Sequence, residues 1–329
     1  MKRTKQFIIS TAIFTWSIVT LIFLTGIVFP PTYNLAENTI KCEKTICPSF
    51  TYKGGAMILQ PKIYIVLWGK AWTDQGKDAN LLKKLANAEK TFFVKIDKTS
   101  WWKVLQQYKE GSQSIQNIVS VKVLNLASNP KRNIGMNDYS NATKQIIHQY
   151  HIHNTPNTIM IFLTQPGVNI TSNDNGNQNS KTHNFCAYHS TTPVQSGVFN
   201  QVAYIAIPFL EDKYWTNCIS NFIPSSQNLN AEQQLIAATM VISSHELAET
   251  ITDPQYYNLE SWTANLFSQK FINAGMYEIA DICILQDYVN NDITMPNIEV
   301  TQTNNHLYVE NIYSNKLFLQ HPNHVPCTS

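Results

Sequence analysis

One long apolar helix, expected between Asn230 and Pro254, constrains the fold more than any other segment. Asn230 followed three residues later by Gln233 is typical of a capping box, and Pro254 ends the helix because proline disfavours helical geometry in the residue before it. Apolar residues recur at helical spacing between these ends, so we predict an amphipathic helix. His245 and Glu249 fall on its apolar stripe. A carboxylate there is costly unless it is paired or bound to a metal ion.

The pentapeptide HELAE, from His245 to Glu249, differs from the zinc-peptidase signature HExxH only in its last residue. In that signature, imidazoles at positions i and i+4 bind zinc from one helical face, and the intervening glutamate activates water. A carboxylate can also bind zinc through oxygen. We therefore predict His245 and Glu249 as ligands and Glu246 as the catalytic base. The alternative is a chance match, in which the acidic groups are solvated or paired with lysines.

A second acidic cluster follows about thirty residues downstream, with Glu278 and Asp281 on one helical face. Zinc sites of this kind often take a further ligand from a glutamate on a following helix, while an aspartate orients a ligand histidine through its other ring nitrogen. We predict Glu278 as a ligand and Asp281 as the group that orients His245, placing both at the metal site. Asp253 competes for the ion only if the helix unwinds, because it lies about 12 Å beyond His245 along an ideal helix.

Five other short segments, in their order along the chain, carry a family resemblance together with these two acidic motifs. They are Tyr52–Gly55, Ile63–Trp72, Trp101–Trp102, Ile159–Thr164 and Phe185–His189. From about residue 51 to about residue 290, the chain resembles the EXORDIUM, or phosphate-induced, protein family. The resemblance implies a secreted, wall-associated protein, and the family has no established biochemical activity.

The N-terminus is typical of an export signal, because basic residues precede a long apolar run from Phe7 to Phe29. The run exceeds the ~7–15 apolar residues of a usual signal peptide and approaches the ~20 that span a bilayer. We expect residues 1–29 to be a signal anchor or signal peptide, and residues 30–50 to be a linker. The predicted location is extracytoplasmic, with the protein either secreted or held by one N-terminal transmembrane segment.

The cysteine count and the net charge indicate disulfides and limit the classes of partner that the protein can bind. The chain has six cysteines, and an even number after an export segment indicates disulfides. Cys283 directly follows the acidic cluster, so we expect a disulfide there to hold that cluster in place. The net charge of +2, with no basic run beyond the N-terminus, excludes nucleic acid as a partner. The 11 glycines form no phosphate-binding loop, which argues against nucleotide binding.

Apolar strand-like runs alternate with helical patterns along the rest of the chain. This order predicts an α/β fold in which a mixed, largely parallel sheet is flanked by helices, with a zincin-like HExxE helix, in a single domain spanning residues 51–329. Asn304-Asn305 predicts the turn of a final hairpin. The expected strands are Lys62–Trp68, Ile118–Leu126, Thr158–Thr164 and Val202–Ile207, and the expected helices are Ala79–Phe93, Trp101–Tyr108 and one from Asp138 or Ser140 to Gln149.

Two functions fit these features. The first is metal-dependent hydrolysis, of peptide bonds, with zinc as the cofactor. Calcium is the alternative ion, because it prefers oxygen ligands. The second is a non-catalytic protein that binds a cell-wall polymer or a protein partner. His189 is either a ligand or transition-state donor near the site, or a structural residue beside Cys186 and Tyr188.

Overall fold

The computed structural model describes residues 49–153, 156–171, 186–194, 201–210, 229–254, 260–265, 278–281, 283, 297–299, 306–316 and 327–328. The expected signal segment, residues 1–29, and nearly all of the expected linker lie outside these residues. Within the described part of the chain, no helix is long and apolar enough to cross a membrane.

A five-stranded sheet forms the centre of the fold, in the strand order β5-β2-β7-β10-β9. The first four of these strands run parallel, and β9 is antiparallel to β10 at one edge. Central strand β7 is buried along its whole length, as expected for a parallel strand covered on both faces. The prediction of a mixed, largely parallel sheet is therefore confirmed. The strands are β2 (Lys62–Trp68), β5 (Ser120–Leu126), β7 (Thr158–Thr164), β9 (Tyr188–Pro193) and β10 (Gln201–Ile207).

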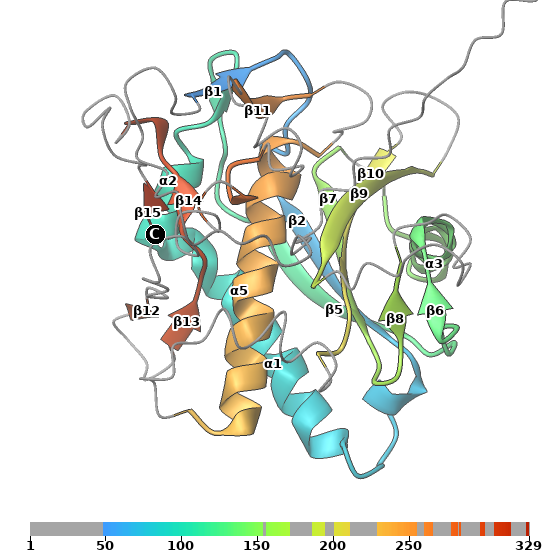
Figure 1. The fold of residues 1–329 in the computed structure, drawn as a ribbon. Coiled ribbons are helices and arrows are strands. Elements are labelled where there is room, and N and C mark those ends of the chain that lie inside the picture. Colours follow the sequence, from blue (N-terminus) through green and yellow to red (C-terminus); the bar gives the residue numbers. More distant parts are fainter. Residues whose placement is uncertain are drawn as a thin grey trace, which may run out of the picture.

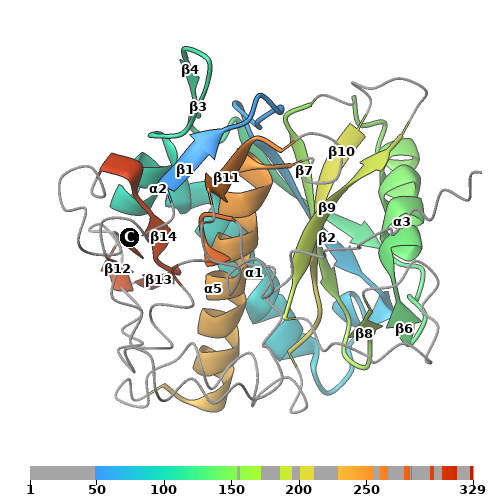
Figure 2. The same ribbon diagram turned by 45° about the horizontal axis from the view of Figure 1, so that its top comes forward.

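Helices cover both faces of this sheet. Figure 1 shows α1 and α5 on one face and α3 on the other, and Figure 2 shows the same layers after rotation. Each face buries its own hydrophobic cluster, the larger one beneath α1, α2 and α5. The helices are α1 (Ala79–Lys95), α2 (Ser100–Leu105), α3 (Met136–Gln149) and α5 (Ala231–Thr252), with short 3-10 turns at Lys70–Trp72 and Ile96–Lys98.

Two helix boundaries differ from expectation for local reasons. α3 begins at Met136, because Gly135 is its N-cap and Asp138 sits three residues into the helix, where its carboxylate accepts a hydrogen bond from the Gly135 N–H at 3.1 Å. α2 ends at Leu105, short of the expected Tyr108, and Thr99 caps its start. At the start of both helices, a side chain that accepts hydrogen bonds from free N–H groups decides where the helix begins.

The second half of helix α5 is buried on every side, which corrects the prediction of an amphipathic helix there. It begins at the predicted capping box of Asn230 and Gln233, and its last residue is Thr252. All residues from Ala237 to Thr252 are buried. The helix packs against β9 and β10 on one side, and against α1 and β13 (His306–Tyr308) elsewhere, so no face of its second half is left for solvent. Polar groups on any of its faces must therefore find partners inside the protein.

The C-terminal segment returns to the outer side of α5 (Figure 1). Antiparallel pairing of β12 with β13 confirms that a hairpin forms here. Its register pairs Glu299 with His306, so more residues join the strands than the predicted turn at Asn304-Asn305, which lies outside the described residues. A disulfide joins Cys283 to Cys327, which confirms the prediction for Cys283. The remaining strands form two-stranded pairs: β1 (Ser49–Tyr52) with β11 (Trp262–Asn265), β3 (Lys109–Glu110) with β4 (Gln113–Ser114), β6 (Asn133–Ile134) with β8 (Asn169–Ile170), β12 (Asn297–Glu299) with β13 (His306–Tyr308), and β14 (Ile312–Tyr313) with β15 (Cys327–Thr328).

Candidate metal centre

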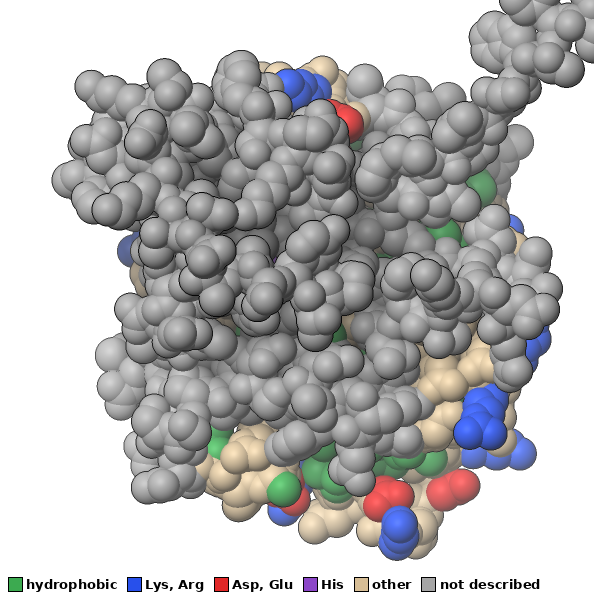
Figure 3. All heavy atoms as spheres, viewed as in Figure 1, with side chains coloured by type: hydrophobic (Ala, Val, Ile, Leu, Met, Phe, Trp, Pro, Cys, Tyr) green, Lys and Arg blue, Asp and Glu red, His purple; other side chains and the backbone are tan. Residues whose placement is uncertain are grey.

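The HELAE residues lie in the fully buried half of α5. His245, Glu246 and Glu249 are each 0% exposed. Among the described residues, the charged partners of these three side chains are histidines and carboxylates, and no lysine there pairs with them. Figure 3 shows one face of the molecule, viewed as in Figure 1, and none of the side chains coloured there is a histidine. Burial therefore contradicts the interpretation of HELAE as a solvated motif, and within the described part of the chain nothing supports lysine pairing.

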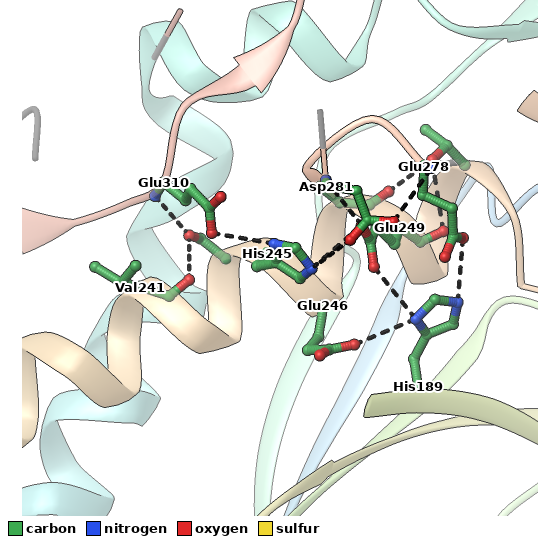
Figure 4. Close-up of polar contacts among 11 residues, drawn as sticks. His189, Val241, His245, Glu246, Glu249, Glu278, Asp281 and Glu310 are labelled. Atoms are coloured by element: carbon green, nitrogen blue, oxygen red, sulfur yellow. Dashed lines mark hydrogen bonds and ion pairs between the residues drawn. The ribbon is translucent and has the colours of Figure 1, made fainter. Parts of the chain in front are cut away.

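The first group of possible ligands surrounds Nε2 of His245. Oε1 of Glu249, one turn later on α5, lies 3.2 Å from this nitrogen, and Oδ1 of Asp281 lies 3.7 Å from it. The backbone N–H of Asp281 also donates to Oε1 of Glu249 at 3.3 Å. Figure 4 shows the three side chains converging. This geometry follows from helical spacing for the pair on α5, and from the packing of the 278–281 segment for Asp281.

The other nitrogen of His245 contacts Glu310, a residue that sequence analysis did not single out. Nδ1 lies 3.0 Å from Oε2 of Glu310, which is 5% exposed. The Glu310 backbone is fixed on both sides: its N–H donates to Ser244 Oγ at 2.9 Å, and its carbonyl accepts from Trp101 Nε1 at 2.8 Å. Glu310 thus occupies the orienting position that we expected for Asp281, while Asp281 lies on the same side of the imidazole as Glu249.

The second group surrounds His189, which projects from edge strand β9 toward α5 (Figure 4). Its Nδ1 lies 3.2 Å from Oε2 of Glu246 and 3.7 Å from Oε2 of Glu249. Its Nε2 lies 3.4 Å from Oε1 of Glu278. His189 therefore belongs to the site, and its contacts favour the functional interpretation over a purely structural one. Glu278, expected beside His245, has its recorded contact with His189 instead.

Asp253 occupies a separate position at the C-terminal end of α5. Its Oδ1 accepts a hydrogen bond from the Ser261 N–H at 3.0 Å. Burial, together with the nearby charge of Glu278, raises the pKa of Asp253 to about 8. The helix does not unwind before Thr252, so Asp253 stays outside both ligand groups.

In the ion-free protein, the excess of carboxylates makes the cluster retain protons. Burial alone lowers the pKa of each imidazole, but neighbouring carboxylates outweigh it and raise both values well above the usual range: Glu278 and Glu246 act on His189, and Glu249 and Glu310 on His245. Burial also raises the pKa of Glu249, and the charge of Asp281 raises it further. Burial brings the pKa of Asp281 itself to about 7. A cation would replace these protons, because metal ligands bind in their deprotonated forms.

The unpaired atoms also fit a cation. Within the described residues, the buried atoms that lack a hydrogen-bond partner include Nε2 of His245, Oε2 of Glu249 and Oε1 of Glu246. Ligand atoms about 2.0–2.1 Å from a tetrahedral zinc ion lie about 3.4 Å apart. The separations of 3.2 and 3.7 Å around His245 Nε2 are close to this value. The donor set of one imidazole and two carboxylates can therefore hold a divalent ion.

The conserved region of phosphate-induced protein 1 matches residues 50–284. The chain belongs to this EXORDIUM-like family. The matched region contains the central sheet, α5, His189 and the segment with Glu278 and Asp281, whereas Glu310 lies beyond it. No curated protein and no solved structure matches the chain.

Proposed function

We propose that this EXORDIUM-like protein is a metal-dependent hydrolase whose ion is held by His245, Glu249 and Asp281. One observation carries the proposal: Nε2 of His245 faces two buried carboxylates while Nδ1 of the same ring contacts Glu310. A carboxylate on the opposite nitrogen fixes the imidazole tautomer that leaves Nε2 free to bind a metal. Glu278, which the sequence placed among the ligands, supports the site through its contact with His189.

Zinc is the ion that suits this donor set best. Imidazole nitrogen favours zinc and related transition metals, whereas calcium prefers an all-oxygen shell. Two carboxylate ligands place more negative charge on the ion than two histidines would. The ion is then a weaker Lewis acid and lowers the pKa of bound water less than in an HExxH site. We therefore expect slow hydrolysis.

Glu246 is the proposed general base. It follows His245 on α5, and its Oε2 contacts His189 Nδ1 at 3.2 Å while its Oε1 has no hydrogen-bond partner. The free oxygen can accept a proton from attacking water, and His189 holds the carboxylate in place. A positioned base contributes about 10²–10⁴-fold to a rate. The proposed substrate class is a peptide bond, on the similarity of HELAE to HExxH.

An extracytoplasmic location is the matching proposal for the whole protein. The basic and apolar N-terminus supports export. The disulfide between Cys283 and Cys327 supports an oxidising compartment, and Cys186 is disulfide-bonded as well. In such a location, the accessible partners include peptides and cell-wall polymers.

The burial of the site also favours a second function. All three proposed ligands are at most 6% exposed, and closed metal sites commonly have a structural role. The protein would then be a wall- or partner-binding module that is stabilised by its ion. Affinity for wall polymers would in that case survive changes to Glu246.

Metal content and peptide cleavage test the proposal. Elemental analysis of the dialysed domain should find zinc in the wild type and much less in His245→Ala. A peptide library should be cut by the wild type and not by Glu246→Gln, although this variant keeps the ion at His245. A metal-free wild type whose melting temperature is unchanged by a chelator would refute the site, and equal cleavage by wild type and Glu246→Gln would refute the base.

A further inference from the structure

The two oxygens of Glu249 face two different histidines. Oε1 lies 3.2 Å from Nε2 of His245, and Oε2 lies 3.7 Å from Nδ1 of His189. The first oxygen also accepts the Asp281 N–H, whereas the second has no hydrogen-bond partner although Glu249 is fully buried. Only the first oxygen belongs to the ion site proposed above. The second is aimed at a separate set of side chains (Figure 4).

That separate set has the geometry of a cation site. One ligand atom from each of His189, Glu246 and Glu249 lies within 4.8 Å of the other two, as the ligand atoms around His245 do. The separations from Nδ1 are 3.2 and 3.7 Å, the same as around Nε2 of His245, and close to the ~3.4 Å expected for ligands of a tetrahedral divalent ion. Nε2 of His189 lies 3.4 Å from Oε1 of Glu278, a charge contact on the opposite side of the ring in which neither atom has a hydrogen-bond partner.

The negative charge of the carboxylate cluster also favours a second cation. The cluster has five buried carboxylates, and when all five are ionised and both imidazoles are neutral, one divalent ion leaves a formal charge of −3. A second divalent ion reduces this charge to −1. Uncompensated buried charge is costly, so the first ion does not remove the tendency of the cluster to take up cations. The five residues are Glu246, Glu249, Glu278, Asp281 and Glu310.

We propose that His189, Glu246 and Glu249 form a second, inhibitory cation site, bridged through Glu249 to the first. The inference rests on the proposed function for its inhibitory effect, because the second ion occupies the carboxylate that serves as the base. Ions bridged by one carboxylate in two-metal sites lie about 3.5–4 Å apart. A protein loaded with one ion is then the active form, and excess zinc shuts hydrolysis off.

Metal stoichiometry tests the second site independently of activity. Apoprotein is titrated with zinc by calorimetry, and then with cobalt by electron paramagnetic resonance. The wild type should bind two ions, and the second equivalent of cobalt should reduce the signal of the first through coupling across Glu249. His189→Asn should bind one ion and lose the coupling. Glu246→Gln is a second variant with the same expected stoichiometry, should the histidine variant fail to fold.

A matched control excludes adventitious binding at the surface. His151 is exposed and belongs to a His-x-x-His-x-His run, and its positive φ of 48° is a conformation that asparagine adopts readily. His151→Asn should leave the stoichiometry at two. Saturation of the wild type at one ion, or two coupled ions in His189→Asn, would overturn the second site alone. Absence of any bound ion would overturn the proposed function as well.

Discussion

Glu89 provides a test of the core that does not depend on the metal. This glutamate lies on α1 against α5 and is 0% exposed. Its Oε2 accepts a hydrogen bond from Ser243 Oγ at 2.7 Å, and its Oε1 has no hydrogen-bond partner. Burial raises the pKa of Glu89 from 4.5 to about 8, although the Ser243 hydrogen bond lowers it in part. We predict that Glu89→Gln removes a pH-dependent cost from the folded protein.

The sign follows from proton binding. Between the unfolded pKa of 4.5 and the folded pKa of about 8, the folded state holds a proton that the unfolded state has lost. Stability therefore falls as the pH rises through this window, by about 1.4 kcal/mol per pH unit. The full loss is about 5 kcal/mol, reached above pH 8. Glutamine carries no charge and can still accept the Ser243 hydrogen bond through its amide oxygen.

Urea unfolding of wild type and variant, with chelator present throughout, measures the difference. The two free energies of unfolding should agree below about pH 5 and diverge above it, with the variant the more stable by about 3 kcal/mol near pH 7 and by about 5 kcal/mol near pH 9. Comparison at each pH cancels titration of the metal centre, which both proteins share.

Glu232 supplies the control for this experiment. It pairs with Lys84 at 2.8 Å, also between α5 and α1, but its side chain is 37% exposed. An exposed ion pair contributes little, so Glu232→Gln should shift stability by less than about 1 kcal/mol at every pH. Parallel stability curves for wild type and Glu89→Gln across the whole pH range would show that the Glu89 carboxyl is not held in its neutral form.

Three further predictions concern the site and its support. Glu310→Gln should weaken zinc binding about 10–100-fold, because His245 loses the carboxylate that fixes its tautomer; competition with a chromogenic chelator measures the dissociation constant, and an unchanged value would exclude the orienting role. Glu246→Gln should retain the ion at His245 and lose about 10²–10⁴-fold in peptide hydrolysis, followed as kcat; an unchanged kcat would assign the proton to another group. Cys327→Ser opens a disulfide to Cys283 that spans 44 residues, and should cost about 4 kcal/mol in urea unfolding; a loss under about 1 kcal/mol would show that the C-terminal strand is held by other contacts.

Local sequence patterns determined several strands and the ends of the longest helix of this protein. The strands Lys62–Trp68 and Thr158–Thr164 and the ends of α5 were predictable, because they depend on neighbouring residues: apolar runs, a capping box and a proline. The contact between His245 and Glu249 was predictable for the same reason, since residues four apart on a helix are neighbours. The disulfide at Cys283 followed from the number and placement of cysteines.

Only the tertiary structure decided what surrounds those two residues. Glu310 and His189 reach the centre from segments 65 and 57 residues away from their partners on α5, with no spacing that relates them. The packing of the 278–281 segment placed Asp281 beside His245, as predicted, but at Nε2, the nitrogen that Glu249 also faces. It placed Glu278, which was expected beside His245, next to His189. Short-range patterns cannot encode such an arrangement, because burial of α5 between the sheet, α1 and the C-terminal segment determines which side chains meet.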